Sequence, residues 1–190
     1  MLIQYLIKQS RKPSGLVGRL ITNIWSSYFK ELSLWAIKQT TIPNNSRILE
    51  IGYGGGSTIK NLLALDKDLD IHGIDISEES YHTARRIHSE AIENGSVKLR
   101  IGNVANLPYQ NSDFDLVFAI QTHIFWDDLK QSFQEIYRVM SNPSTLIIAS
   151  EKEKIKYHMT DYGTSHELKR LCMLSLRVIR KFNKKLLNQI

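Results

Sequence analysis

The residues best suited to chemistry lie in one short stretch, Glu50 to Ser57, which reads Glu-Ile-Gly-Tyr-Gly-Gly-Gly-Ser. Glycines lack a Cβ atom, so the backbone can turn sharply there and approach a ligand closely. Ser57 is placed to begin a helix whose first N–H groups would face that ligand. Because clustered glycines carry an entropic cost on folding, we interpret this stretch as a ligand-binding loop rather than as a tight turn alone.

A second acidic residue, Asp75, follows 19 residues after Gly56, at the end of a short apolar run. A carboxylate at this place can accept hydrogen bonds from the two ribose hydroxyls of an adenosine-containing cofactor. A dinucleotide-binding domain would share these features. The glycines, however, are spaced G-x-G-x-G rather than G-x-G-x-x-G, which disfavours a nicotinamide dehydrogenase.

Short apolar runs alternate with helical patterns from residue 46 onwards. Five strands are predicted, over 47–51, 69–74, 97–101, 115–120 and 145–149. Ser77 is the expected N-cap of a helix that ends at Asn94-Gly95, and another helix is expected over about 128–140. This alternation indicates an α/β fold with a Rossmann-like, doubly wound, mostly parallel sheet. Ligands of such sheets bind at the carboxyl ends of the strands, where the strand order reverses.

The two ends of the chain differ from this alternating region. Residues 1–45 predict N-terminal helices, broken at Pro13-Ser14-Gly15, with one apolar face. That face consists of Trp25, Tyr28, Phe29, Leu32, Trp35 and Ala36. We hypothesise that this segment is a cap or lid; a helix simply packed on the sheet is the alternative. The remainder, 46–190, would complete a single compact domain.

The C-terminal region, 163–190, is predicted to be a basic helix. Its apolar side would carry Val178, Ile179, Phe182 and Leu186. No sixth or seventh strand is predicted, which leaves open whether the final antiparallel strands are missing. An exposed sheet edge would need covering by a helix or a partner chain, so a homodimer is one hypothesis.

Four motifs, in order, resemble those of class I S-adenosylmethionine-dependent methyltransferases, most closely the small-molecule enzymes of the ubiquinone-biosynthesis-like group. They are Glu50–Gly56, Gly73–Ser77, Gly102–Tyr109 with Phe114–Val117, and Glu135–Pro143. Ser144-Thr145 replaces the family's two glycines, which predicts a different turn. The resemblance implies a methyltransferase with S-adenosylmethionine as cofactor and S-adenosylhomocysteine as product.

The resemblance also implies which residues meet the methionine part of the cofactor. Gly52, Tyr53 and Gly54 would lie beneath it, and Glu50 would order their loop. Gln121, directly after the fourth predicted strand, would lie beside the methionyl end.

The adenosine part would meet a second group of residues. Asp75 would bind the ribose, and Ile76 would pack on the adenine ring, although Ile76 can equally be a core residue. Asn103 and Val104 would meet the adenine edge. Asn103 stands where the family usually has Asp, and its amide oxygen could still accept a hydrogen bond from the adenine amino group.

Methyl transfer depends mainly on alignment, and a general base is needed only when the acceptor is protonated. His123 is the candidate base, because it follows Gln121 by two residues in the loop that faces the reactive end. A structural or solvated histidine is the alternative.

Charge is distributed unevenly. Residues 1–46 carry a net charge of +5, residues 47–150 carry −5, and residues 151–190 carry +6. The basic ends leave open an RNA or protein methyltransferase, but they also fit solvated helix faces. A cofactor-binding module without catalysis is a further alternative.

Composition excludes several other classes. Cys172 is the single cysteine, and the histidines show no ligand spacing, so no metal site is predicted. No apolar run has the length of a membrane span, and no secretory signal is recognised, so we expect a cytoplasmic enzyme acting on a small molecule.

Overall fold

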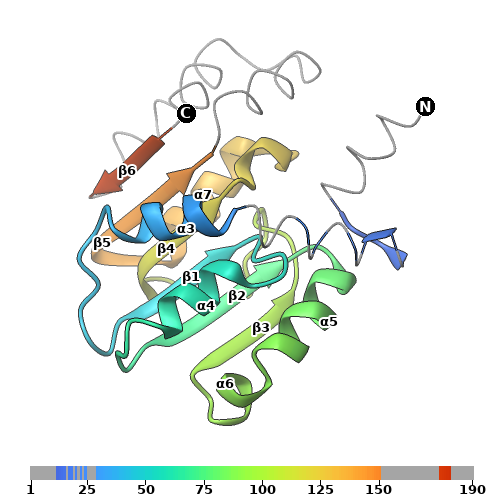
Figure 1. Cartoon of the computed structure of the whole chain (residues 1–190). Coiled ribbons are helices and arrows are strands. Elements are labelled where there is room, and N and C mark those ends of the chain that lie inside the picture. Colours follow the sequence, from blue (N-terminus) through green and yellow to red (C-terminus); the bar gives the residue numbers. More distant parts are fainter. Residues whose placement is uncertain are drawn as a thin grey trace.

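The computed structural model describes residues 12–15, 17, 18, 20, 22, 24 and 29–150, and the backbone of 176–180. Within these residues one sheet has six strands in the order β3-β2-β1-β4-β5-β6 (Figure 1). The strands are β1 (Arg47–Ile51), β2 (Asp70–Asp75), β3 (Val97–Ile101), β4 (Phe114–Ile120), β5 (Met140–Ala149) and β6 (Leu176–Arg180). β1 to β5 are parallel, which confirms the predicted Rossmann-like sheet.

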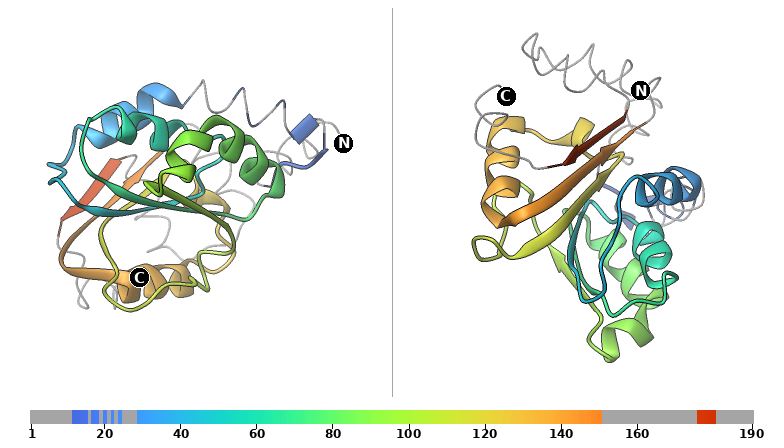
Figure 2. Two further views of the ribbon diagram at one scale, coloured as in Figure 1. Left: turned by 90° about the horizontal axis from the view of Figure 1, so that it is seen from below. Right: turned by 90° about the vertical axis from the view of Figure 1, so that its left-hand side faces the viewer.

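Helices cover both faces of this sheet. They are α3 (Lys30–Ile37), α4 (Ser57–Leu63), α5 (Glu78–Ile87), α6 (Ser89–Glu93) and α7 (Leu129–Val139). Figure 2 shows α3, α4 and α5 on one face and α7 on the other. The arrangement is therefore doubly wound, as the alternating pattern predicted. In the described part of the chain, no helix has both the length and the apolar character that crossing a bilayer requires.

The strand β1 shows why the sheet lies at the centre of the domain. Ile48 belongs to the apolar cluster that includes Ile59 and Leu62 of α4. Leu49 belongs to the opposite cluster, which includes Phe133 of α7. Because successive side chains of a strand point to opposite faces, a strand that buries both must be covered on both sides.

The predicted C-terminal helix is wrong over Leu176–Arg180, which forms β6. β6 pairs antiparallel with β5, with Ile179 opposite Leu146 and Leu176 opposite Ala149. The open edge of β5 supplies backbone partners, and β-branched residues such as Val178 and Ile179 suit a strand. One antiparallel strand of the fold is therefore present, while Phe182 and Leu186 lie outside the described residues.

The helix predicted from Ser77 to Asn94 is divided in two. Ser77 is the N-cap, as expected, and its hydroxyl oxygen accepts a hydrogen bond from the Ser80 backbone N–H at 3.2 Å. α5 ends at Ile87, and His88 adopts φ −110° and ψ 25° before α6 begins. At this division the side chain of His88 is buried.

A pair of charged residues on α7 holds the loop that follows β3. Arg138 forms an ion pair with Glu135 at 2.7 Å and donates to the carbonyl oxygens of Leu107 and Tyr109 at 2.9 and 2.8 Å. Glu135 in turn accepts the Leu107 backbone N–H at 2.8 Å. The E-x-x-R spacing thus fixes the loop that carries two of the predicted adenine contacts.

The N-terminal prediction is covered only in part. The described positions from 15 to 24 are helical, and α3 begins at Lys30 with Ala36 buried. Trp25 and Tyr28, predicted on the same apolar face, lie outside the described residues. The division of the chain into a lid and a binding domain therefore stays a prediction.

Candidate cofactor site

The glycine loop lies between β1 and α4 at the carboxyl edge of the sheet, beside the reversal of strand order between β1 and β4 (Figure 1). Gly52 has φ 73°, and its N–H donates to Ile74 O at 2.7 Å. A Cβ atom on Gly52 would overlap the methyl group of Thr122. Thr122 also donates its hydroxyl to Ile51 O at 3.1 Å, so the residues that follow β4 pack directly against the glycine loop.

Asp75 links the glycine loop to the turn after β2. One carboxylate oxygen accepts the Gly54 N–H at 2.9 Å, and the other accepts the Ser77 N–H at 2.9 Å. Burial raises the pKa of Asp75 to about 6, and these backbone hydrogen bonds oppose the rise. The carboxyl group is therefore mostly ionised at neutral pH.

Glu50 supports the other end of the loop, at the start of α4. The N-cap of that helix is Gly56, which has no side chain to bind the first N–H groups. Glu50 is buried and accepts hydrogen bonds from the Thr58 side chain and the Ile59 backbone instead. The loop-ordering role of Glu50 stays a prediction, and these two hydrogen bonds are the contacts through which it would act.

The two carboxyl groups differ in charge at neutral pH. Burial raises the pKa of Glu50 to about 8, while hydrogen bonding from Thr58 lowers it and repulsion from Asp75 raises it further. Glu50 is therefore mainly protonated at pH 7, whereas Asp75 carries a negative charge. The site presents one buried carboxylate, at the place predicted for the ribose.

Tyr53 points away from the loop surface. Its ring lies against Gly73, where a Cβ atom would come within 2.6 Å of Tyr53 Cδ1. Its hydroxyl donates to Arg100 O at 3.2 Å, and burial raises the pKa of that hydroxyl. Only the backbone of Tyr53 remains for the predicted cofactor contact.

The residues predicted to contact adenine differ in which of their groups remain accessible to a ligand. Ile76 is half-buried. The Asn103 amide oxygen already accepts the Ala105 N–H at 2.9 Å, so its first role is to shape the loop. Val104 is buried in the apolar cluster with Leu107, which leaves its backbone for a ligand.

Gln121 and His123 follow β4 on the other side of the loop. Gln121 has φ 58°, a conformation that costs a residue with a side chain about 1 kcal/mol, and its N–H donates to Ala149 O at 2.7 Å. His123 begins a 3-10 turn, His123–Phe125, and its ring meets Trp126 edge to face at 6.3 Å. Burial lowers the pKa of His123 to about 4, so the ring is neutral at pH 7.

These residues fit S-adenosylmethionine. A Cβ atom on Gly54 would meet no described atom within 4 Å, so no described side chain blocks the approach of a ligand to this backbone. Asp75 accepts the backbone N–H groups of Gly54, Ser77 and Ile76, and an ionised carboxylate has about four acceptor positions. Asp75 thus keeps acceptor capacity for ribose hydroxyls.

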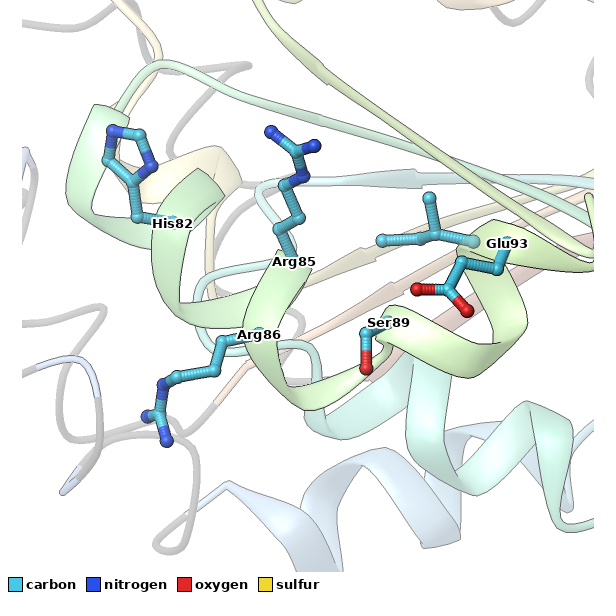
Figure 3. A pocket seen from close by; sticks show the side chains of 6 residues that line it. His82, Arg85, Arg86, Ser89 and Glu93 are labelled. Atoms are coloured by element: carbon cyan, nitrogen blue, oxygen red, sulfur yellow. The ribbon is translucent and has the colours of Figure 1, made fainter.

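A surface hollow of about 320 Å³ lies on α5 and α6, apart from this site (Figure 3). It is lined by His82, Arg85, Arg86, Ser89, Ile92 and Glu93. The guanidinium groups of Arg85 and Arg86 point away from each other in Figure 3, so they do not form a common anion site. None of the predicted site residues lines this hollow. Among the described residues no group of three or more His, Cys, Asp or Glu side chains could hold a metal.

Sequence reasoning missed three side chains that support the loop: Thr122, Thr58 and His88. His88 is 32 residues from Gly56, and its ring nitrogen Nε2 lies 2.9 Å from Gly56 O. Spacing along the chain carries no signal for such a contact, because the two residues belong to different βα units.

Comparisons with known proteins agree with this geometry. A family described as "Methyltransferase domain" matches residues 48–142, half of the chain. The methyltransferase YdaC of Bacillus subtilis (strain 168) is 31% identical over 109 residues, covering 57% of this chain and 58% of that protein. The ajmaline N-methyltransferase of Rauvolfia serpentina is 29% identical over 103 residues, covering 54% of this chain and 35% of that protein. The chain thus spans less than two thirds of the length of either relative.

The fold is shared with solved structures as well. The Haemonchus contortus Phospholethanolamine N-methyltransferase 2, in complex with phosphomonomethylethanolamine and S-adenosylhomocysteine, matches with a TM-score of 0.64 and 19% identity. That match covers 82% of this chain and 40% of the other. The family match, the strand order, and the positions of the glycine loop and Asp75 at the carboxyl edge lead to one assignment. The chain belongs to the class I S-adenosylmethionine-dependent methyltransferases.

Proposed function

We propose that this chain transfers the methyl group of S-adenosylmethionine to a small-molecule acceptor beneath its N-terminal segment. The observation that carries the proposal is a contact between Ser77 and Pro13. The Ser77 hydroxyl donates to Pro13 O at 2.8 Å, while the Ser77 N–H binds Asp75. The N-terminal segment is therefore tied to the turn that holds the ribose-binding carboxylate.

This contact supports a lid role for residues 1–45. Val17, Leu20 and Ile24 recur at helical spacing and are exposed, Leu20 by 60%. Apolar surface on a segment tied to the site suits an acceptor that is partly apolar. Gly18 and Thr22 are buried on the same segment, so it also has a side that packs inward.

The relatives support a small acceptor. The name of the Rauvolfia serpentina protein states ajmaline as its methyl acceptor. By contrast, the described residues of the candidate site include two carboxyl side chains and several glycines, rather than the Lys and Arg side chains that bind phosphates. We therefore favour a small molecule over RNA.

When bound, S-adenosylmethionine supplies an electrophilic methyl group on a sulfonium sulfur. The protein's contribution is alignment. Asp75 would orient the ribose, and the Gly52–Gly54 backbone would carry the methionine part. Gln121 and Thr122 would line the site next to the loop. Thr122 is held there by its hydrogen bond to Ile51 O and by its contact with Gly52.

His123 remains the candidate general base in this proposal. Its Nδ1 is buried and makes no hydrogen bond to any described residue. We assign the proton-accepting role to this atom, which would receive a proton only from an acceptor bound directly against the ring. Because burial keeps the ring neutral, it is in the basic form throughout the physiological pH range. An acceptor that is already deprotonated would not need it.

The test is titration calorimetry with S-adenosylhomocysteine, with NADH as a control ligand, followed by transfer assays. Radiolabelled S-adenosylmethionine would be offered with phenols, amines and thiols, and in parallel with RNA and with protein. We expect micromolar binding of S-adenosylhomocysteine alone, and label on a small molecule. Label on RNA or protein would replace the proposed acceptor class. Binding without transfer to any class would favour a non-catalytic module.

A further inference from the structure

We propose that His88 is a positioning residue that holds the glycine loop in its cofactor-binding conformation. His88 lies at the junction of α5 and α6, 32 residues from Gly56, and is 5% exposed. Its Nε2 lies 2.9 Å from Gly56 O. A carbonyl oxygen only accepts hydrogen bonds, so Nε2 must carry the hydrogen and donate it.

The same carbonyl oxygen has a second donor. Lys60 N–H donates to Gly56 O at 2.9 Å, which is the first helical hydrogen bond of α4. Both lone pairs of Gly56 O are thus used, one by the helix and one by His88. His88 therefore attaches the junction of α5 and α6 to the point where the loop becomes a helix.

Packing strengthens this attachment. Gly56 has φ 79°, and a Cβ atom there would overlap Nε2 of His88 and come within 3.5 Å of Ala84 Cβ. The imidazole lies directly on the Gly56 backbone, in space that only a glycine leaves free. The ring thereby fixes the left-handed conformation of Gly56 by contact as well as by hydrogen bonding.

The position of Gly56 decides the position of the ligand-facing backbone. Gly56 N–H donates to Tyr53 O at 2.7 Å, closing the turn Tyr53–Gly56. The middle of that turn is Gly54, whose N–H binds Asp75. A displaced Gly56 would move Gly54 and weaken the link to the carboxylate predicted to hold the ribose. His88 acts through this backbone and touches no cofactor itself.

The surroundings favour the neutral imidazole, which donates through Nε2 and carries no hydrogen on Nδ1. Burial lowers the pKa of His88, the bond to Gly56 O opposes that shift, and the nearby Lys60 adds to the lowering. The backbone of His88 is also satisfied, since its N–H binds Ala84 O at 2.9 Å and its O accepts from Ile92 N–H at 3.0 Å. The backbone of His88 is therefore held from both sides of the helix break, and its ring projects from a fixed position.

The inference rests on the cofactor site but not on the identity of the acceptor. Two substitutions separate the hydrogen bond of His88 from its packing: His88→Gln keeps an N–H donor of similar reach, and His88→Leu fills the space without a donor. His82→Ala, at an exposed residue of α5, is the control. Titration with S-adenosylhomocysteine measures affinity, and hydrogen exchange of the cofactor-free protein measures protection of the 52–56 amides. Wild-type binding first establishes the site itself.

We expect His88→Leu to weaken S-adenosylhomocysteine binding about tenfold and to speed exchange of the loop amides. His88→Gln should stay within about threefold of wild type, and His82→Ala should be unchanged. Once an acceptor is known, His88→Leu should raise KM for S-adenosylmethionine more than it lowers kcat. The inference is overturned if His88→Leu binds like wild type, or if Gln and Leu lose affinity equally, since loss of the imidazole's packing would then explain the effect. Absence of binding by wild type would instead overturn the cofactor site.

Discussion

Asp75 and Gly54 are joined by a hydrogen bond of 2.9 Å, from the backbone N–H of the glycine loop to the carboxylate at the end of β2. The two motifs that predict a cofactor are therefore one physical unit. Asp75 shapes the loop, and in the proposed site its remaining acceptor capacity would serve a ligand. Any change at Asp75 should affect folding and binding together.

The substitution Asp75→Asn tests this coupling. An amide keeps one oxygen acceptor but places an NH₂ group against one of the two N–H donors, from Gly54 and Ser77. We expect S-adenosylhomocysteine affinity to fall at least about tenfold, and the free energy of unfolding to fall by about 1–3 kcal/mol. Calorimetry and chemical denaturation measure these, with the exposed Asp68→Asn as control. Normal affinity in Asp75→Asn would remove Asp75 from the site.

Glu50 should make stability depend on pH. Its pKa is raised from the ordinary 4.5 to about 8 in the folded protein by burial, so the folded state binds the proton more tightly than the unfolded state. The stabilisation is complete below about pH 4.5 and is lost as the pH rises towards 8.

The variant Glu50→Gln has a neutral side chain at every pH, so its stability should not fall as the pH rises towards 8. We expect it to exceed wild type in free energy of unfolding at pH 8 by more than about 1 kcal/mol, and to lose the advantage at pH 5. Urea denaturation at several pH values measures the difference, with the exposed Glu90→Gln as reference. Parallel pH curves for wild type and Glu50→Gln would contradict it.

Gly52 should tolerate no side chain. Gly52→Ala combines an unfavourable φ of 73° with overlap against Thr122, whereas Gly95→Ala has φ 84° and open space among the described residues. We expect about 1 kcal/mol of destabilisation at Gly95 and at least about 1–3 kcal/mol more at Gly52. Thermal unfolding compares the two. Equal losses would show that Thr122 moves aside easily.

The Ser77 hydroxyl should hold the N-terminal segment in place through Pro13, and losing it should leave α5 intact. Ser77→Asp keeps an N-cap acceptor for α5 but has no hydroxyl to donate to Pro13 O. Faster hydrogen exchange is expected in a peptide spanning residues 12–24, while the peptides of α5 stay protected. Ser89→Asp, at the start of α6, is the control. Unchanged exchange over 12–24 would mean that Pro13 is held by other contacts.

His123 should be visible in the pH profile once an acceptor is found. As a general base with a pKa of about 4, it is inactivated by protonation, so kcat/KM should fall as the pH drops through about 4 and stay level to neutral pH. His123→Asn should lose this acid limb and lower kcat about 10²–10⁴-fold, with S-adenosylhomocysteine affinity retained. An unchanged kcat would mean that His123 takes no part in proton transfer and has only a structural role at the acceptor site.

Local patterns in the sequence determined much of this protein. The apolar runs over 47–51 and 97–101, the glycine cluster and the N-cap at Ser77 are short-range signals, since each depends on the conformations of a few neighbouring residues. Their order along the chain also predicted the parallel sheet and placed Glu50, the glycines and Asp75 at one edge.

Tertiary structure alone decided how the site is supported. The contact of His88 with Gly56 and the pressing of Thr122 on Gly52 join residues from different βα units, and no spacing predicts such pairs. Tyr53 turns inward because Gly73 leaves room for its ring. Leu176–Arg180 forms a strand because β5 has an edge to pair with, although its residues also suit a helix. In each case the decisive partner is distant in sequence, and the free energy gained by packing or pairing with it exceeds the local preference of the segment.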